Sequence, residues 1–125
     1  VFTCSGGMRM QTNQFSLQAL PKTTIAVQMV KDAKLPYIVV LTDPTSGGVS
    51  ASFGMLGDIT IAEPNASIMF AGASVTKNTT GETIPEEVQK AEYLLEHGFI
   101  DQIVHRREIR DSLAQVMSIL LKRAA

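Results

Sequence analysis

A run of β-branched residues at positions 37–42 constrains the fold of this chain more than any other segment. It reads Tyr-Ile-Val-Val-Leu-Thr, with Pro36 before it and the turn-forming residues 43–48 after it. β-Branched residues favour strands, and a run without polar alternation is typical of a strand buried on both faces. Such a strand lies inside a sheet that other elements cover on both sides. The run therefore predicts the centre of a mainly parallel sheet in an α/β domain.

Helical and strand-like segments alternate around this run. Residues 9–33 predict a helix that Pro21 breaks or kinks, because proline has no N–H and clashes with the preceding turn. Apolar residues recur at helical spacing in its second half, so we expect an inward face made of Ile25, Ala26, Met29, Val30 and Ala33.

The second half of the chain predicts shorter elements. We expect helices at residues 49–56 and from Pro85 to Gly98, a final helix with an apolar stripe, and strands at residues 59–62, 67–70 and 102–104. The Thr-rich and Gly-rich residues 72–84 show no periodicity and predict a loop. The stripe of the final helix consists of Ile109, Leu113, Val116 and Leu120.

Composition narrows the class of protein. The 125 residues suffice for about one domain, and 45% are hydrophobic, which supports a real core. The formal net charge is -1, so no basic surplus exists to neutralise the phosphates of a nucleic acid. One cysteine and two histidines exclude a disulfide framework and disfavour a structural zinc site. No apolar run approaches the roughly 20 residues of a membrane-spanning helix.

The first residues resemble the end of a strand. Residues 1–4 read Val-Phe-Thr-Cys, with neither an initiating Met nor a targeting pattern. The sequence therefore predicts a fragment of a larger domain, with the earlier strands supplied by another part of the protein or by a complementary chain.

Two segments share one design, in which a strand leads into a glycine pair and then into a helix. They are Cys4-Ser5-Gly6-Gly7-Met8 and Thr45-Ser46-Gly47-Gly48-Val49. Such turns leave backbone N–H groups without intrahelical partners, and glycine lets a ligand atom approach them. Two facing turns could hold one developing negative oxygen, which is an oxyanion hole. The same pattern also fits two ordinary tight turns at one edge of a sheet.

Side chains for other chemistry are scarce. Cys4 lies in an apolar strand, where a buried and inert thiol is expected. His97 and His105 have no partner at catalytic or metal-ligand spacing, and Asp43 and Asp58 resemble turn and cap residues. If the chain is part of an enzyme, backbone donors are expected to carry the catalysis.

Seven motifs together resemble the β subunit of acetyl-CoA carboxylase carboxyltransferase, from bacteria or plastids. They cover nearly the whole chain in the order of that family: SGGMRMQ at residues 5–11, LTDPTSGGVSASF at 41–53, MLGD at 55–58, IAEP at 61–64, FAG at 70–72, EYLLEHG at 92–98 and ID at 100–101.

The resemblance implies a fold and a set of site residues. The fold is the ClpP/crotonase-like α/β superhelix of ββα units, with residues 1–125 as the C-terminal part of the carboxyltransferase domain. In that fold two peptide N–H groups polarise an acyl thioester, and by motif position they belong to Gly7 and Gly48. Gly6, Gly47 and Ser5 are then expected to be substrate-binding neighbours. The family's four-cysteine zinc ribbon lies in an N-terminal half that these residues do not include, so no metal is expected here.

The resemblance also implies a reaction and partners. The family moves carboxylate from carboxybiotin to acetyl-CoA and forms malonyl-CoA, in a biotin-dependent, ATP-binding complex of fatty-acid synthesis. Carboxybiotin and acetyl-CoA are substrates, and no covalently bound cofactor is expected. The expected partners are the carboxyltransferase α subunit and the biotin carboxyl carrier protein, in a hetero-oligomer without nucleic acid or membrane. The expected location is the bacterial cytoplasm or the plastid stroma.

Some positions depart from the family pattern. Met8 stands where the family usually has Ala, and residues 73–79 replace a segment with a different consensus. Two alternatives therefore stay open. One is a carboxyltransferase or decarboxylase that acts on another acyl-CoA, and the other is a non-catalytic scaffold with the same fold.

Overall fold

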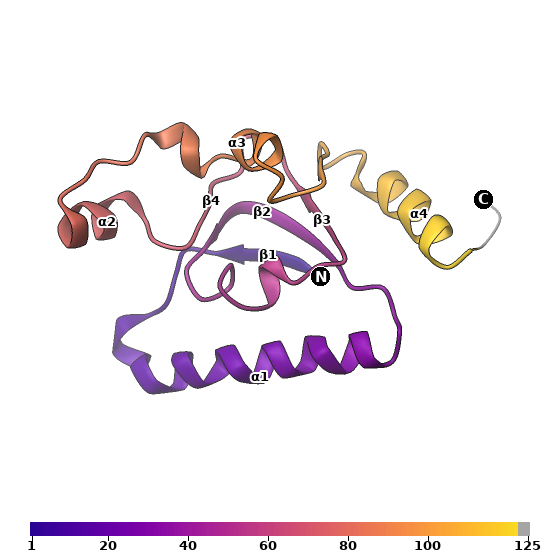
Figure 1. Cartoon of the computed structure of the whole chain (residues 1–125), viewed down its shortest axis with the longest axis horizontal. Coiled ribbons are helices and arrows are strands. Elements are labelled where there is room, and N and C mark those ends of the chain that lie inside the picture. The colour runs from indigo at the N-terminus through magenta and orange to yellow at the C-terminus, as the bar shows by residue number, and fades with distance from the viewer. Residues whose placement is uncertain (123–125) are drawn as a thin grey trace.

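The computed structural model describes residues 1–122 and contains a sheet whose strands pair in parallel (Figure 1). Its strands are β1 (Phe2–Ser5), β2 (Ile38–Ser46), β3 (Ile59–Ala62), β4 (Ile68–Met69) and β5 (Gln102–Ile103). The helices are α1 (Asn13–Asp32), α2 (Ala73–Thr80), α3 (Ala91–Glu96) and α4 (Ile109–Leu120), with 3-10 turns η1 (Met10–Thr12), η2 (Phe53–Met55) and η3 (Glu86–Gln89). The mainly parallel α/β architecture expected from the sequence is confirmed.

β2 is the central strand, as the β-branched run predicts. The order along the sheet is β1-β2-β3-β5, and β4 pairs with the second half of β2. The predicted turn at residues 43–46 is wrong, because β2 continues through a cis Asp43–Pro44 peptide bond as far as Ser46. The reason is the pairing of Thr45 with Ile68 and of Ser46 with Met69, which keeps this end of the strand extended.

Both faces of β2 are buried, as predicted. Val39 and Leu41 face one cluster, to which α1 contributes Val27, α3 contributes Ala91, and Ile100 also belongs. The alternate residues Ile38 and Val40 face a second cluster with Ile61 of β3 and Ile109 of α4. The stripe of α4 is confirmed for Ile109, Leu113 and Val116, whereas Leu120 is exposed.

α1 differs from its prediction in two ways. Pro21 lies inside one continuous helix rather than at a break. The inward residues are Val27 and Val30, whereas Ile25 and Met29 are 61% and 67% exposed. Periodicity identifies residues that share a helix face, but the sheet alone decides which face is covered, so the predicted inward face was wrong for most of its members.

The predicted loop at residues 72–84 contains a helix. α2 ends at Gly81, whose φ of 76° allows its N–H to bond to the Lys77 carbonyl. Threonine hydroxyls inside α2 donate to carbonyls four residues back, for example from Thr79 to Val75 at 2.8 Å. α2 has no buried residue and lies at the end of the molecule opposite α4 (Figure 1).

Two other helical predictions are only partly met. Residues 49–56 form turns and the short η2 rather than a helix. The helix expected from Pro85 is divided into η3 and α3, because Lys90 is extended (φ −97°, ψ 152°) where the Ala91 N–H bonds to the Ala66 carbonyl. Within residues 1–122, no helix combines the length and apolar character needed to cross a membrane.

Candidate functional site

The ends of β1 and β2 bring the two glycine pairs into contact. The strands run parallel, with Ser5 opposite Thr45, so the backbone leaves the sheet on the same side after β1 and after β2. A Cβ added to Gly47 would lie 3.2 Å from the Gly7 Cα and 3.7 Å from the Met8 nitrogen. The Ser46 hydroxyl donates to the Ser5 carbonyl at 2.9 Å and ties one turn to the other. From the sequence, facing turns and two ordinary tight turns at one edge of the sheet were both open, and the structure places the two turns in contact.

Buried hydroxyl groups fix the register just before the turns. The Thr45 hydroxyl lies 2.9 Å from the Thr3 hydroxyl and donates to the Thr42 carbonyl at 2.8 Å. The Thr42 hydroxyl donates to the Thr3 carbonyl at 2.6 Å. Thr45 is fully buried and Thr3 is 2% exposed, so the bond between their hydroxyls forms away from water, and the two bonds that involve Thr42 are partly buried. They hold the two strand ends together where a one-residue slip would separate the glycine pairs.

The second turn, residues 46–48, is tightly bound. Gly47 has a φ of 65°, and its N–H bonds to the Met69 and Phe70 carbonyls, each at 3.1 Å. The Ser50 and Ser52 hydroxyls donate to the Gly47 and Gly48 carbonyls at 2.8 and 2.6 Å. The Gly48 N–H, in contrast, has no acceptor among residues 1–122. Because no α-helix follows, this open N–H belongs to a turn rather than to the helix start that the sequence predicted.

The first turn, residues 5–7, is more open. Gly6 and Gly7 are exposed, and a Cβ added to Gly6 would meet nothing within 4 Å. Gly7 has a φ of 111°, which L side chains rarely adopt. Its N–H donates to the Ser5 hydroxyl oxygen at 3.2 Å. The chain then passes through residues 8 and 9 before η1 and α1, so here too the helix begins later than expected.

Asp43 anchors the strand beside the second turn. Its carboxylate accepts the Ser67 N–H at 2.7 Å, at the start of the segment that supplies the Met69 and Phe70 carbonyls. This hydrogen bond stabilises the charged carboxylate and holds the pKa of Asp43 below its ordinary value. Asp43 therefore has a structural role, in agreement with its assignment as a non-catalytic residue.

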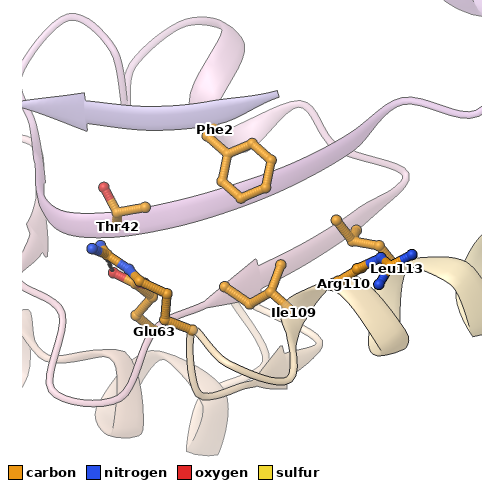
Figure 2. A pocket seen from close by; sticks show the side chains of 7 residues that line it. Phe2, Thr42, Glu63, Ile109, Arg110 and Leu113 are labelled. Atoms are coloured by element: carbon orange, nitrogen blue, oxygen red, sulfur yellow. Dashed lines mark hydrogen bonds and ion pairs between the residues drawn. The ribbon is translucent and has the colours of Figure 1, made fainter.

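A cavity of about 450 Å³ lies elsewhere, between the start of α4 and the sheet, where Phe2 of β1 and Thr42 of β2 line it (Figure 2). Arg106 donates to both oxygens of Glu63 at its wall, through Nε at 2.5 Å and through a terminal nitrogen at 2.9 Å. The guanidinium lowers the pKa of Glu63, which is only 9% exposed. None of the glycines lines this cavity, whose wall consists of Phe2, Thr42, Glu63, Arg106, Ile109, Arg110 and Leu113.

The remaining candidate side chains do not form a second site. Cys4 is exposed rather than buried as predicted, because β1 lies at the edge of the sheet and Cys4 faces away from the core. Its sulfur lies 4.0 Å from the Asp43 carbonyl. His97 stacks on Tyr93 with ring centroids 3.8 Å apart, and His105 accepts the Arg107 N–H at 3.3 Å. In the part of the chain that the structure describes, no three His, Cys, Asp or Glu residues gather to hold a metal ion.

Sequence reasoning missed the hydroxyls that assemble the site. Ser46 and Thr45 were assigned to a turn, and Thr3 to an apolar strand. The available signal was the presence of three threonines and a serine in the strands that lead into the glycine pairs. Buried hydroxyls must find hydrogen-bond partners, so these residues indicated bonds between the two strands.

Comparison with known sequences confirms the resemblance to carboxyltransferase β subunits. The chain is 55% identical over 125 residues to acetyl-coenzyme A carboxylase carboxyl transferase subunit beta of Bartonella grahamii, covering 100% of this chain and 41% of the relative. It is 59% identical over 120 residues to the protein of the same name from Granulibacter bethesdensis, covering 96% of this chain and 39% of the relative. The chain thus spans about two fifths of the length of these curated relatives, and no family model matches it.

Comparison with solved structures confirms the crotonase-like fold. Transcarboxylase 12S, solved with methylmalonyl-coenzyme A and methylmalonic acid bound, matches with a TM-score of 0.73 and 26% identity, over 94% of this chain and 23% of that chain. The Pseudomonas malonate decarboxylase hetero-dimer matches with a TM-score of 0.76 over 97% of this chain and 52% of that chain. Its 22% identity bears on the fold alone.

Proposed function

We propose that this chain, similar over its whole length to the β subunits of acetyl-CoA carboxylase carboxyltransferase, carries the thioester-activating part of such an enzyme. The reaction is the transfer of carboxylate from carboxybiotin to acetyl-CoA, which yields malonyl-CoA for fatty-acid synthesis. Residues 1–125 form part of the carboxyltransferase domain rather than all of it.

The contact between the two glycine turns is the observation that carries this proposal. Gly48 presents an open N–H, and Gly7 presents an N–H held only by the hydroxyl of Ser5. A thioester oxygen within about 3 Å of both nitrogens would accept two hydrogen bonds, which strengthen as negative charge develops on it. The Gly47 N–H is bonded to the Met69 and Phe70 carbonyls, so Gly47 would border the substrate without donating to it.

These donors act on the acetyl group. Loss of a proton from the acetyl methyl gives an enolate whose oxygen carries the charge, and the Gly7 and Gly48 amides stabilise it. Carboxybiotin supplies CO2 by cleavage of its N1–carboxylate bond, and the ureido group left behind takes the methyl proton. The enolate carbon then bonds to CO2. No side-chain base is required in this scheme; the Asp43 carboxylate beside the second turn is bonded to the Ser67 N–H.

The partners and location follow from the same proposal. The acyl-CoA site is completed by a carboxyltransferase α subunit, and the biotin carboxyl carrier protein delivers carboxybiotin. A structural zinc ion belongs to the zinc ribbon of the longer β subunit, not to residues 1–125. The complex acts in the bacterial cytoplasm, or in the plastid stroma if the chain is of plant origin; the relatives named above are bacterial.

A second candidate is the same chemistry on another acyl-CoA. The likeness to a transcarboxylase solved with methylmalonyl-coenzyme A favours it. Activity on propionyl-CoA without activity on acetyl-CoA would select this candidate.

The test uses the full-length β subunit assembled with its α subunit. Gly48→Pro removes the open N–H, and we expect malonyl-CoA formation to fall by about 100- to 1,000-fold in kcat. Gly48→Ala is the matched control, because it keeps the N–H and its methyl meets the flexible end of Leu20, whose Cδ2 lies 2.9 Å away. We expect a much smaller loss from it. A fully active Gly48→Pro enzyme would refute the proposed role, and we expect residues 1–125 alone to be inactive.

A further inference from the structure

The two proposed donors differ in what they are bonded to. The Gly7 N–H donates to the Ser5 hydroxyl oxygen two residues earlier, at 3.2 Å. The Gly48 N–H has no acceptor in the part of the chain that the structure describes. An N–H that is bonded to the protein must exchange that bond before it can bind a substrate oxygen.

The backbone of Ser5 is fixed while its hydroxyl can rotate. Ser5 pairs with Thr45 in the sheet, and its carbonyl accepts the Ser46 hydroxyl at 2.9 Å. Among residues 1–122, the hydroxyl oxygen of Ser5 has the Gly7 N–H as its single partner. Rotation about one side-chain bond therefore frees the amide without moving the turn or either strand.

We infer that the Ser5 hydroxyl is a stand-in acceptor, which holds the Gly7 N–H until a thioester oxygen replaces it. This inference rests on the proposed function and changes the expected role of Ser5. Ser5 is a positioning residue that competes with the substrate oxygen instead of binding it. In the absence of substrate its hydroxyl holds the amide of an exposed turn, where a Cβ added to Gly6 would meet nothing within 4 Å.

Removal of the Ser5 hydroxyl lowers the KM for acetyl-CoA if the hydroxyl competes with the substrate oxygen, and raises it if the hydroxyl binds the substrate. In the assembled enzyme, Ser5→Ala removes the tethered competitor, so we expect the KM for acetyl-CoA to fall about three- to tenfold with kcat changed little. Ser5→Thr keeps an acceptor at the same place and should retain the KM of the unmodified enzyme. Ser112→Ala in α4 is the control for loss of a serine hydroxyl elsewhere.

Inhibition by free CoA shows whether the effect of Ser5→Ala depends on the thioester carbonyl of acetyl-CoA. Free CoA has no thioester oxygen, so its inhibition constant should be the same with Ser5→Ala as with serine. A merely structural change in the turn would alter the affinities for CoA and acetyl-CoA together.

The outcomes separate this inference from the proposed function. A raised or unchanged KM for acetyl-CoA with Ser5→Ala, or a parallel change for free CoA, would overturn the stand-in role. If Gly48→Pro still abolishes activity in that case, the oxyanion proposal survives and only the inference about Ser5 fails. A fully active Gly48→Pro enzyme would overturn both.

Discussion

The two glycine turns are built from nearly the same residues but are held in different ways. In the second turn, Gly47 is fixed by bonds to two carbonyls at the β4 end, and nearby serine hydroxyls bind the carbonyls of the glycine pair. In the first turn, Gly6 and Gly7 are exposed, and a hydroxyl two residues earlier holds the Gly7 amide. The Gly48 N–H is therefore open in a tightly bonded turn, whereas the Gly7 N–H is bonded to a hydroxyl in an exposed turn. On the proposed function, the oxyanion site would combine one fixed donor with one that the substrate oxygen must take over from Ser5.

The largest expected difference in stability between the two turns comes from adding a methyl group to a glycine of each. Gly47→Ala forces an L residue into a φ of 65° with its Cβ 3.2 Å from the Gly7 backbone, so we expect a loss of about 2–4 kcal/mol of stability. Gly6→Ala meets nothing within 4 Å, and we expect a change within about 0.5 kcal/mol. Denaturant unfolding of the full-length β subunit measures both. Equal losses would show that the turns are equally constrained.

Thr45→Val tests whether the hydroxyl network keeps the turns in register. The substitution preserves shape but removes a fully buried hydroxyl bonded to Thr3 and Thr42. Leaving buried polar groups without a partner is expected to lower stability by about 1–3 kcal/mol. Thr79→Val, on exposed α2, is the control and should change stability much less. An unaffected Thr45→Val protein would contradict the role of the network.

Asp43 should make the second turn pH-dependent and leave the first turn unaffected. Its folded pKa lies below the ordinary value, so the ionised carboxylate stabilises the fold above that ordinary value. This contribution is lost as the pH falls through the lowered pKa. Asp43→Asn should therefore reduce stability at neutral pH, and the difference should shrink in acid. Thermal unfolding at several pH values measures this stability difference between the two proteins. A difference that grows on acidification would contradict the stabilising role of the Asp43 carboxylate.

The smallest effect is expected from Cys4, which lies next to the first turn. Its thiol is exposed, and the sulfur lies 4.0 Å from the Asp43 carbonyl. Cys4→Ala should keep kcat within about twofold, because the proposed chemistry uses no thiol. Steady-state kinetics of the assembled enzyme measures this. A loss of a thousandfold or more with the fold intact would reinstate Cys4 as a nucleophile.

Sequence reasoning succeeded where local pattern and global packing agree. The run at residues 37–42 had to be the central strand, since no other place in the fold buries both faces of a β-branched segment. The strand at residues 59–62 was also predicted correctly. The shared design of the two glycine pairs suggested that they could face each other, and the family resemblance favoured that arrangement over two ordinary turns.

The failures have physical reasons as well. Residues 43–46 contain turn-forming types, yet pairing with β4 keeps them extended, and no local pattern reveals a distant strand. α2 was missed because threonine lowers helix propensity, although Gly81 is a typical helix end. The exposure of Cys4 depends on β1 being an edge strand, and the bond from Gly7 to Ser5 depends on turn conformation. Neither property is encoded in residue type alone.

The carbonyl stretch of bound acetyl-CoA tests the central claim most directly. Acetyl-CoA carrying an isotope label at the thioester carbon gives a separate infrared band, which two hydrogen bonds would shift to lower frequency. We expect this shift in the assembled enzyme without carboxybiotin, and we expect Gly48→Pro to remove a large part of it while acetyl-CoA stays bound. A band at the frequency of acetyl-CoA in water, or one that Gly48→Pro leaves unchanged, would contradict the account.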